Sequence, residues 1–442
     1  MLKTFFNAFK IDEIRKKLFY TFLMLIVIRL GSQIPTPGTN PEFIQQFFGQ
    51  VTGGAFNFFN AFTGGSFEQM SIFALSISPY ITSSIIVQLL TIAIPKLEEM
   101  QKDGEDGRKK INTITRFVTV GLALIQATAM AVGFGNQGLL VKYNFINVVT
   151  VVLTLTAGSA FLMWAGERIT EKGIGNGISI ILLINILSSV PSDFARLYVQ
   201  FMSGKVWWKA VLAAVIILLI ILAVVIFVIY LQEGQRKIAV QYSQKVQGRK
   251  SVGGQSSFIP LKVNTAGVIP VIFASSLMQF PILIATFLGK DLENGKGIGY
   301  EILNGLNSNN WFKLDDFHYT WGLIVYIVLT VAFAYFYTSI TFNPLEIANN
   351  MKKSGGFIPG IRPGKPTVDY LAKILKYIIF VGAVGLVIVQ VIPFFFNGVF
   401  GAMVSFGGTS LIIIIGVVLE TIQQIESQML VRNYTGFLNN GK

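Results

Sequence analysis

The chain has 442 residues, of which 52% are hydrophobic and only 13% are charged, and its mean hydropathy is +0.62. A soluble globular protein carries about 25% charged residues, so this composition excludes an ordinary soluble fold. The absence of cysteine and the single histidine, His318, argue against a disulfide framework, a metal centre and a histidine proton relay. We therefore expect a membrane protein without metal or cofactor.

Apolar blocks of about twenty residues recur along the chain, which is the length a helix needs to cross a hydrocarbon core of roughly 30 Å. We expect the first block to remain as a span, because Arg29 interrupts its apolar run and no small-residue cleavage site follows. In chain order, the ten predicted spans cover residues 18–34, 71–94, 115–134, 146–166, 177–190, 210–231, 265–288, 320–340, 374–392 and 409–425.

The net charge of +13 is distributed unevenly between the segments that join these spans. If the N-terminus is cytoplasmic, 27 lysines and arginines fall in cytoplasmic segments and 7 in outer segments. Such an excess is typical of the positive-inside rule. The topology predicted is ten spans with both termini in the cytoplasm.

The predicted spans divide equally around the outer loop near residues 191–209. We assign residues 1–195 to an N-terminal half and 196–442 to a C-terminal half. Because each half holds an odd number of spans, the halves enter the membrane in opposite directions. This arrangement is typical of inverted repeats, whose interface often carries the transport pathway.

The stretch 56–67 is rich in phenylalanine, glycine and asparagine and is too short to cross a membrane. Taken alone, its pattern favours a helix in an outer loop. The alternative is a re-entrant segment, which survives at membrane depth only inside protein or beside water. The residues by themselves leave both interpretations open.

Two long segments between spans carry basic residues and well-defined turn chemistry. Residues 232–264 alternate apolar and polar side chains before a glycine pair, which predicts a small hairpin projecting from the membrane. Residues 341–376 combine lysines and Arg362 with several Pro-Gly turns. Both segments are longer than is needed to join two spans and to place positive charge on one side of the membrane. Their length favours a role as docking platforms for a partner.

The spans contain almost none of the charged groups that ion-coupled transporters and pumps use to bind their coupling ion. Arg29, Glu167 and Glu420 lie near span ends. The chain has neither a P-loop nor a recognisable nucleophile or zinc-protease motif. These observations indicate a passive conduit. A ring of branched aliphatic side chains could close such a conduit by excluding water and ions. From composition alone, however, any single aliphatic residue in a span is better explained as ordinary helix packing.

Seven stretches resemble the SecY/Sec61 family, and specifically its bacterial members, in the family's order and spacing over essentially the whole chain. One of them reads Pro359-Gly360-Ile361-Arg362-Pro363-Gly364. The seven cover residues 29–38, 71–81, 166–180, 260–270, 342–344, 359–364 and 406–410.

This resemblance implies an all-α polytopic membrane protein, with ten transmembrane helices in two inverted five-helix halves around a central pore and a re-entrant plug at residues 56–67. The implied pore ring is Ile77, Ile81, Ile178, Leu182, Ile272 and Ile413. The implied plug residues are Phe56, Asn57, Phe58, Phe59, Asn60, Phe62, Gly64, Gly65 and Phe67. A lateral gate between the second and seventh spans would involve Thr82, Ser83, Gln88, Ser275, Ser276 and Gln279.

The resemblance further implies a channel subunit of the bacterial inner membrane that passes unfolded polypeptides and releases membrane segments sideways into lipid. The implied partners are the small subunits SecE and SecG, the motor ATPase SecA, the ribosome, the translocating chain and membrane lipids. The basic residues implied to dock them are Arg236, Lys237, Arg249, Lys250 and Arg362. Competing interpretations are a small-solute secondary transporter, an intramembrane enzyme, and an accessory paralogue with dedicated substrates.

Overall fold

The computed structural model describes residues 9–40, 42–43, 60, 62–204, 207–242, 245–247, 250–252, 256–287, 297–311, 317–400 and 408–439. Each of the ten predicted spans coincides with a helix. These helices are α2 (Asp12–Gly31), α5 (Ser78–Ala93), α7 (Glu105–Phe134), α8 (Phe145–Lys172), α9 (Gly177–Phe201), α10 (Trp207–Glu233), α11 (Ile269–Phe287), α13 (Trp321–Thr341), α15 (Lys365–Phe400) and α16 (Gly408–Asn439).

Most of these helices are long and apolar enough to cross a bilayer. Within the described residues, seven meet this condition alone, and α5 with the following α6 (Pro95–Lys102) makes an eighth, bent by 106°. Of the other two, α11 is a shorter apolar helix and α2 opens with charged residues, as expected where a helix enters the membrane interface. The chain is a multi-pass membrane protein.

The second span begins later than predicted. Residues 72–77 form turns, and positive φ occurs at Met70 just before them and at Ser76 within them. The helix starts at Ser78 with Pro79 in its first turn. Proline favours this position because the first turn of a helix needs no donated N–H bond from it. At the other end, Ile94 is extended before Pro95, which turns α6 away from the axis of α5.

The fifth span is longer than predicted. Asn176 caps it by accepting hydrogen bonds from the backbone N–H groups of Ile178 and Ser179, and the helix continues through Pro191 to Phe201. The half boundary predicted at residue 195 therefore lies inside α9. A Cβ atom on Gly177 would collide with the carbonyl oxygen of Gly166, so glycine is what permits the close contact of α9 with α8.

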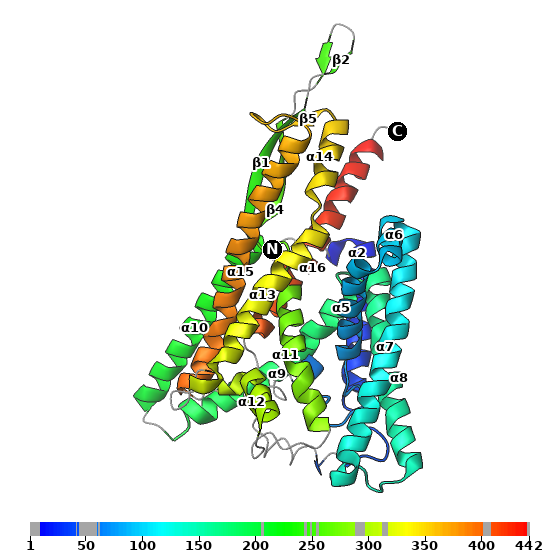
Figure 1. Ribbon diagram of the computed structural model, residues 1–442, viewed down its shortest axis with the longest axis vertical. Helices are drawn as coiled ribbons and strands as arrows, with labels where there is room; N and C mark the ends of the chain where they lie inside the picture. Colours follow the sequence, from blue (N-terminus) through cyan, green and yellow to red (C-terminus); the bar gives the residue numbers. More distant parts are fainter. Residues whose placement is uncertain are drawn as a thin grey trace.

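The helices pack as two groups joined by a few contacts. In Figure 1, α2, α5, α7 and α8 stand on one side, and α10, α13 and α15 stand on the other. Helices α9 and α16 pack against each other between the groups, and α11 contacts both α13 and α7. The relation of the two groups by an inverted repeat stays a prediction.

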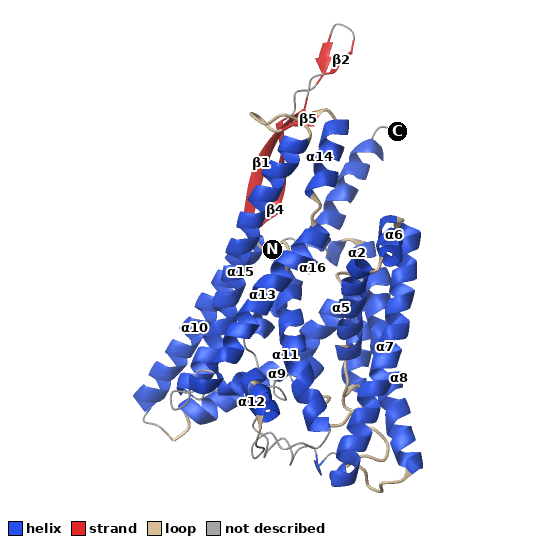
Figure 2. Cartoon of the chain, in the orientation of Figure 1, coloured by secondary structure: helices blue, strands red, loops and turns tan. Residues whose placement is uncertain are grey.

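A small β-structure projects from one end of the helical bundle (Figure 2). Strand β1 (Gln235–Tyr242) pairs antiparallel with β4 (Ser256–Lys262), with Gln235 opposite Lys262. Beyond them, β2 (Lys245–Gln247) pairs with β3 (Lys250–Val252). The hairpin predicted for residues 232–264 is thereby confirmed.

The second long segment joins the same sheet, which the sequence did not predict. After α14 (Pro344–Lys353), the two-residue strand β5 (Gly356–Phe357) pairs with the end of β1, giving the strand order β4–β1–β5. Beneath the sheet, Ile238 and Val240 are buried against Leu371 of α15. The two segments between spans and the start of α15 thus share one hydrophobic core.

Candidate functional site

The six residues implied to form the pore ring lie in one apolar cluster, which we call the waist: Ile77, Ile81, Ile178, Leu182, Ile272 and Ile413. They come from four elements that are distant in sequence, namely α5 with the turn before it, α9, α11 and α16. Four of the six are at most 8% exposed, and Ile81 and Ile178 are partly buried. The waist carries no charge, so water and ions gain little by entering it.

The turn before α5 gives Ile77 a special position in the waist. Ile77 is the N-cap residue of α5 rather than part of the helix, and it is fully buried. On α9, Ile178 and Leu182 are four residues apart and therefore face the same way. Ile272 lies in the first turn of α11, and Ile413 in the first two turns of α16.

The described part of the implied plug comprises Asn60 and residues 62–67. Residues 62–67 lie against the waist, and we call them the plug stem; Asn60 donates from Nδ2 to Glu68 Oε2 at 2.9 Å. Phe62 belongs to the same apolar cluster as the waist, whereas Phe67 packs in the neighbouring cluster with Met130 of α7. Gly64 and Gly65 both have positive φ, which explains the tight turns of this stretch. The implied plug residues Phe56, Asn57, Phe58 and Phe59 lie outside the described residues.

Polar side chains hold the plug stem to two helices. Arg29 of α2 donates from Nη1 to the carbonyl oxygen of Gly64 at 3.2 Å. Asn185 of α9 donates from Nδ2 to the carbonyl oxygen of Phe62 at 3.2 Å and to Ser76 Oγ at 3.1 Å. These bonds satisfy carbonyl groups that no regular helix or strand would pair.

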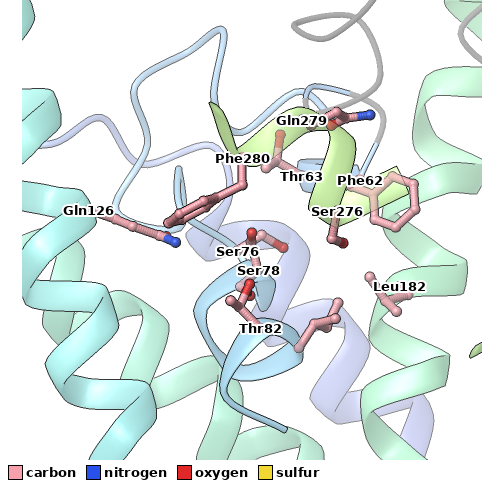
Figure 3. A pocket seen from close by; sticks show the side chains of 11 residues that line it. Phe62, Thr63, Ser76, Ser78, Thr82, Gln126, Leu182, Ser276, Gln279 and Phe280 are labelled. Carbon is pink, nitrogen blue, oxygen red and sulfur yellow. The ribbon is translucent and has the colours of Figure 1, made fainter. Parts of the chain in front are cut away.

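A small cavity of about 50 Å³ opens beside the waist, between α5 and α11. Of the implied gate residues, Thr82, Ser276 and Gln279 line it, together with Ile81 and Leu182 of the waist. Figure 3 shows Ser276 on α11 pointing toward the side of the cavity that holds Ser76, Ser78 and Thr82, whereas the Gln279 side chain points away from them. The cavity holds only a few water molecules, at about 10–15 Å³ each.

The other three implied gate residues lie away from this cavity. Ser83 is fully buried and donates to the carbonyl oxygen of Pro79 at 2.9 Å, while Gln88 donates to Ser84 Oγ at 3.2 Å. Ser275 faces a second cavity of about 40 Å³, behind α11, that is also lined by Tyr326 and Gln279. Gln279 therefore borders both cavities.

Several residues of the first cavity were not predicted from the sequence, among them Ser76, Ser78, Gln126 and Phe280. Gln126 of α7 and Phe280 of α11 both line it. The signal for Gln126 was present, because an amide inside an otherwise apolar span is uncommon and marks a functional site by default. Phe280 carried no such signal, since aromatic residues are common in spans.

The implied docking residues lie on the β-structure and on the turn that follows it. Arg236 and Lys237 are exposed on β1, and the Lys237 ammonium lies 4.8 Å from the ring centre of Phe258. Arg362 is exposed, and its carbonyl oxygen accepts a hydrogen bond from the buried Thr367 hydroxyl, which orders this turn. Lys250 lies on β3, and Arg249 lies outside the described residues.

Two of the three charged residues near span ends, Glu167 and Arg29, have structural partners, and Glu420 is exposed. Glu167 accepts a hydrogen bond from Arg116 Nε at 2.7 Å, which links α8 to α7, and Arg29 is bonded to the plug stem. Among the described residues, no three histidine or acidic side chains group together as they would around a metal ion. The chemistry offered is that of a non-polar constriction with a polar seam beside it.

Comparison with known proteins finds relatives that match over the full length of the chain. The family model named SecY matches residues 71–422. The chain is 43% identical to the protein translocase subunit SecY of Bacillus subtilis, covering 100% of both chains, and 43% identical to that of Halalkalibacterium halodurans, covering 99% and 100%.

Solved structures share the fold at lower identity. One, described as a protein-conducting channel, has a TM-score of 0.61 at 18% identity, covering 94% of this chain and 93% of its own. Another, of a SecY whose plug domain stabilises the closed channel, has a TM-score of 0.62 at 19% identity, covering 94% and 92%. A third, Sec61 in a canine ribosome–channel complex, has a TM-score of 0.59 at 17% identity, covering 94% and 93%.

The helical bundle and the full-length relatives, which are named protein translocase subunits, define a multi-pass membrane protein of that class. The chain belongs to the SecY family. Its place is a bacterial membrane, which it crosses several times.

Proposed function

We propose that this chain is the pore-forming subunit of a bacterial protein translocase, and that the waist is the constriction through which the polypeptide passes. The observation that carries the proposal is the convergence of six aliphatic side chains from four elements in one chargeless cluster. Non-directional contacts of this kind exclude ions by dewetting, yet yield around a chain of any sequence. Energy for movement then comes from a partner.

The seam between α5 and α11 is the lateral gate in this proposal. Thr82 of α5 and Ser276 of α11 line the first cavity from opposite sides, so polar side chains border the seam between the two helices there. Each Leu, Ile, Phe or Val favours the bilayer by about 0.3–0.6 kcal/mol at a helix centre, so about twenty of them gain on the order of 6–12 kcal/mol. When the seam opens, an apolar segment of the passing polypeptide gains this free energy by entering the lipid, whereas a secreted, polar segment does not. Membrane segments are thereby separated from secreted chain.

The end of the bundle that carries the β-structure is the cytoplasmic end in this proposal, and both termini lie on that side. It holds Arg236, Lys237 and Arg362 exposed on an ordered platform. Relatives of the chain are translocase subunits, and one structural neighbour was solved with a ribosome. We infer docking of the SecA motor or a ribosome on this platform, and association with SecE and SecG in the membrane.

Single-cysteine crosslinking tests the proposed path, because the chain contains no cysteine of its own. Cysteines at Ile81 and Ile272 should crosslink to a secretory chain arrested during translocation. A cysteine at Ile324 of α13, which is 60% exposed on the outside of the bundle, is the matched control and should react with lipid probes instead. Crosslinking at Ile324 but not at the waist would refute the assigned path.

A further inference from the structure

Two side chains, those of Ser188 and Arg29, and the backbone of Asn185 converge on Gly64 of the plug stem. A Cβ atom added to Gly64 would lie 2.8 Å from Ser188 Oγ, 2.9 Å from Arg29 Nη1 and 2.9 Å from Asn185 Cα. The φ of Gly64 is +65°. Only glycine therefore fits both the backbone conformation and the close approach of α2 and α9.

Ser188 and Arg29 both reach the carbonyl oxygen of Gly64, but they differ in how fully their hydrogens are available to it. Ser188 Oγ has one hydrogen and two acceptors in reach, the carbonyl oxygen of Asn185 at 2.6 Å and that of Gly64 at 3.2 Å. The shorter bond, within α9, engages this hydrogen most of the time. Arg29 reaches Gly64 from α2 with a guanidinium that has five N–H donors, so it is the dependable donor.

Asn185 connects the plug stem to the turn that precedes α5, one of the two helices of the proposed lateral gate. Its side chain is 3% exposed, and its two amide hydrogens are both used, one on Phe62 and one on the hydroxyl of Ser76. Ser76 immediately precedes Ile77 and α5, and its carbonyl oxygen accepts a hydrogen bond from Ser159 of α8 at 3.0 Å. Displacing the stem would leave this buried amide with an unpaired donor.

We propose that Arg29 and Asn185 are positioning residues that latch the plug stem against α9 and so hold the channel in its resting state. The proposal rests on the proposed channel function. Arg29 lies in the last turn of α2 and is partly buried, and its guanidinium is held by a carbonyl oxygen of the stem. A charge-assisted bond of this kind is stronger than a neutral one.

Neighbouring glycines provide a matched pair of variants for the test. Gly64→Ala introduces both left-handed strain and the collision with Arg29 and Ser188. Gly65→Ala introduces the same kind of strain, since its φ is +81°, but meets nothing within 4 Å. The difference between the two variants isolates the latch contacts. Arg29→Met removes the donor directly, and Arg29→Lys restores a charged donor.

The measurement is the rate at which a water-soluble maleimide labels a cysteine placed at Thr63, which is 1% exposed. In the purified complex, Gly64→Ala should label roughly tenfold or more faster than Gly65→Ala, the factor that corresponds to about 1.4 kcal/mol. Arg29→Met should also label faster than the unsubstituted chain, and Arg29→Lys should reverse part of that increase.

Equal labelling of the two alanine variants, together with an unchanged rate in Arg29→Met, would overturn the latch. The same preparations are assayed for export of a secretory precursor into proteoliposomes. Failure of the unsubstituted chain to export would count against the channel function instead, so the two proposals fail separately.

Discussion

Truncation of one waist side chain tests whether the waist is a seal. Leu182 of α9 is 5% exposed in the waist, and Leu187 of the same helix is 41% exposed on its outer side. Replacing a buried leucine with alanine costs about 2–5 kcal/mol through lost burial and the cavity left behind. In an open, wet pore Leu182 has already lost that burial, so its truncation penalises the closed state selectively.

The expected size of the effect follows from this difference. Taking the lower limit of about 2 kcal/mol, Leu182→Ala should shift the closed-to-open ratio by roughly 30-fold. Leu187→Ala should shift it little, because that side chain has the same surroundings in both states. The assay is single-channel recording of the purified complex in planar bilayers without substrate, with open probability as the readout.

Comparison of Leu182→Ala with Leu187→Ala decides whether the waist is the barrier to ions. If Leu182→Ala gives the same resting open probability as Leu187→Ala, the waist is not the barrier to ions. A loss of folded complex would show in the yield of assembled protein, and Leu182→Val, which removes less volume, then supplies the measurement at smaller amplitude.

Three further outcomes are expected. Deleting residues 56–67 should leave a channel that leaks ions at rest, whereas unchanged conductance would contradict the plug assignment. Arg362→Glu should reduce motor-driven export far more than complex assembly; Arg196→Glu, an exposed change on α9, is the control, and equal export by both variants would dismiss Arg362 as a docking residue. Gly177→Ala should destabilise the complex by at least 1–2 kcal/mol in thermal unfolding, since its Cβ meets the Gly166 backbone, whereas Gly121→Ala has open space and should be neutral or slightly stabilising.

The positions of the helices were predictable because bilayer thickness imposes one length on every span. Their ends were not. The second helix starts at Ser78 because a turn with positive φ at Ser76 precedes it, and the apolar residues of that turn look like more helix in the sequence. Likewise, α9 passes through Pro191, a residue that usually marks a helix boundary.

The site was only partly visible from residues alone. Ile77, Ile272 and Ile413 have the composition of ordinary packing residues, and only the fold brings them into one cluster. The resemblance to the SecY/Sec61 family supplied their assignment. The joining of β5 to β1 had no local signal, because a two-residue strand is too short to show alternation.

The platform that carries Arg236, Lys237 and Arg362 shares one long helix, α15, with the membrane-spanning bundle. Helix α15 runs for 36 residues, with Pro393 in its last turns, which is roughly 54 Å and well beyond the thickness of the hydrocarbon core. Its first turns form the core beneath the β-sheet, and its later turns pack against α13 and α16. A load applied by a docked partner would therefore tilt α15 as a lever, moving Ile413 and α11 relative to the opposite helices rather than bending a loop.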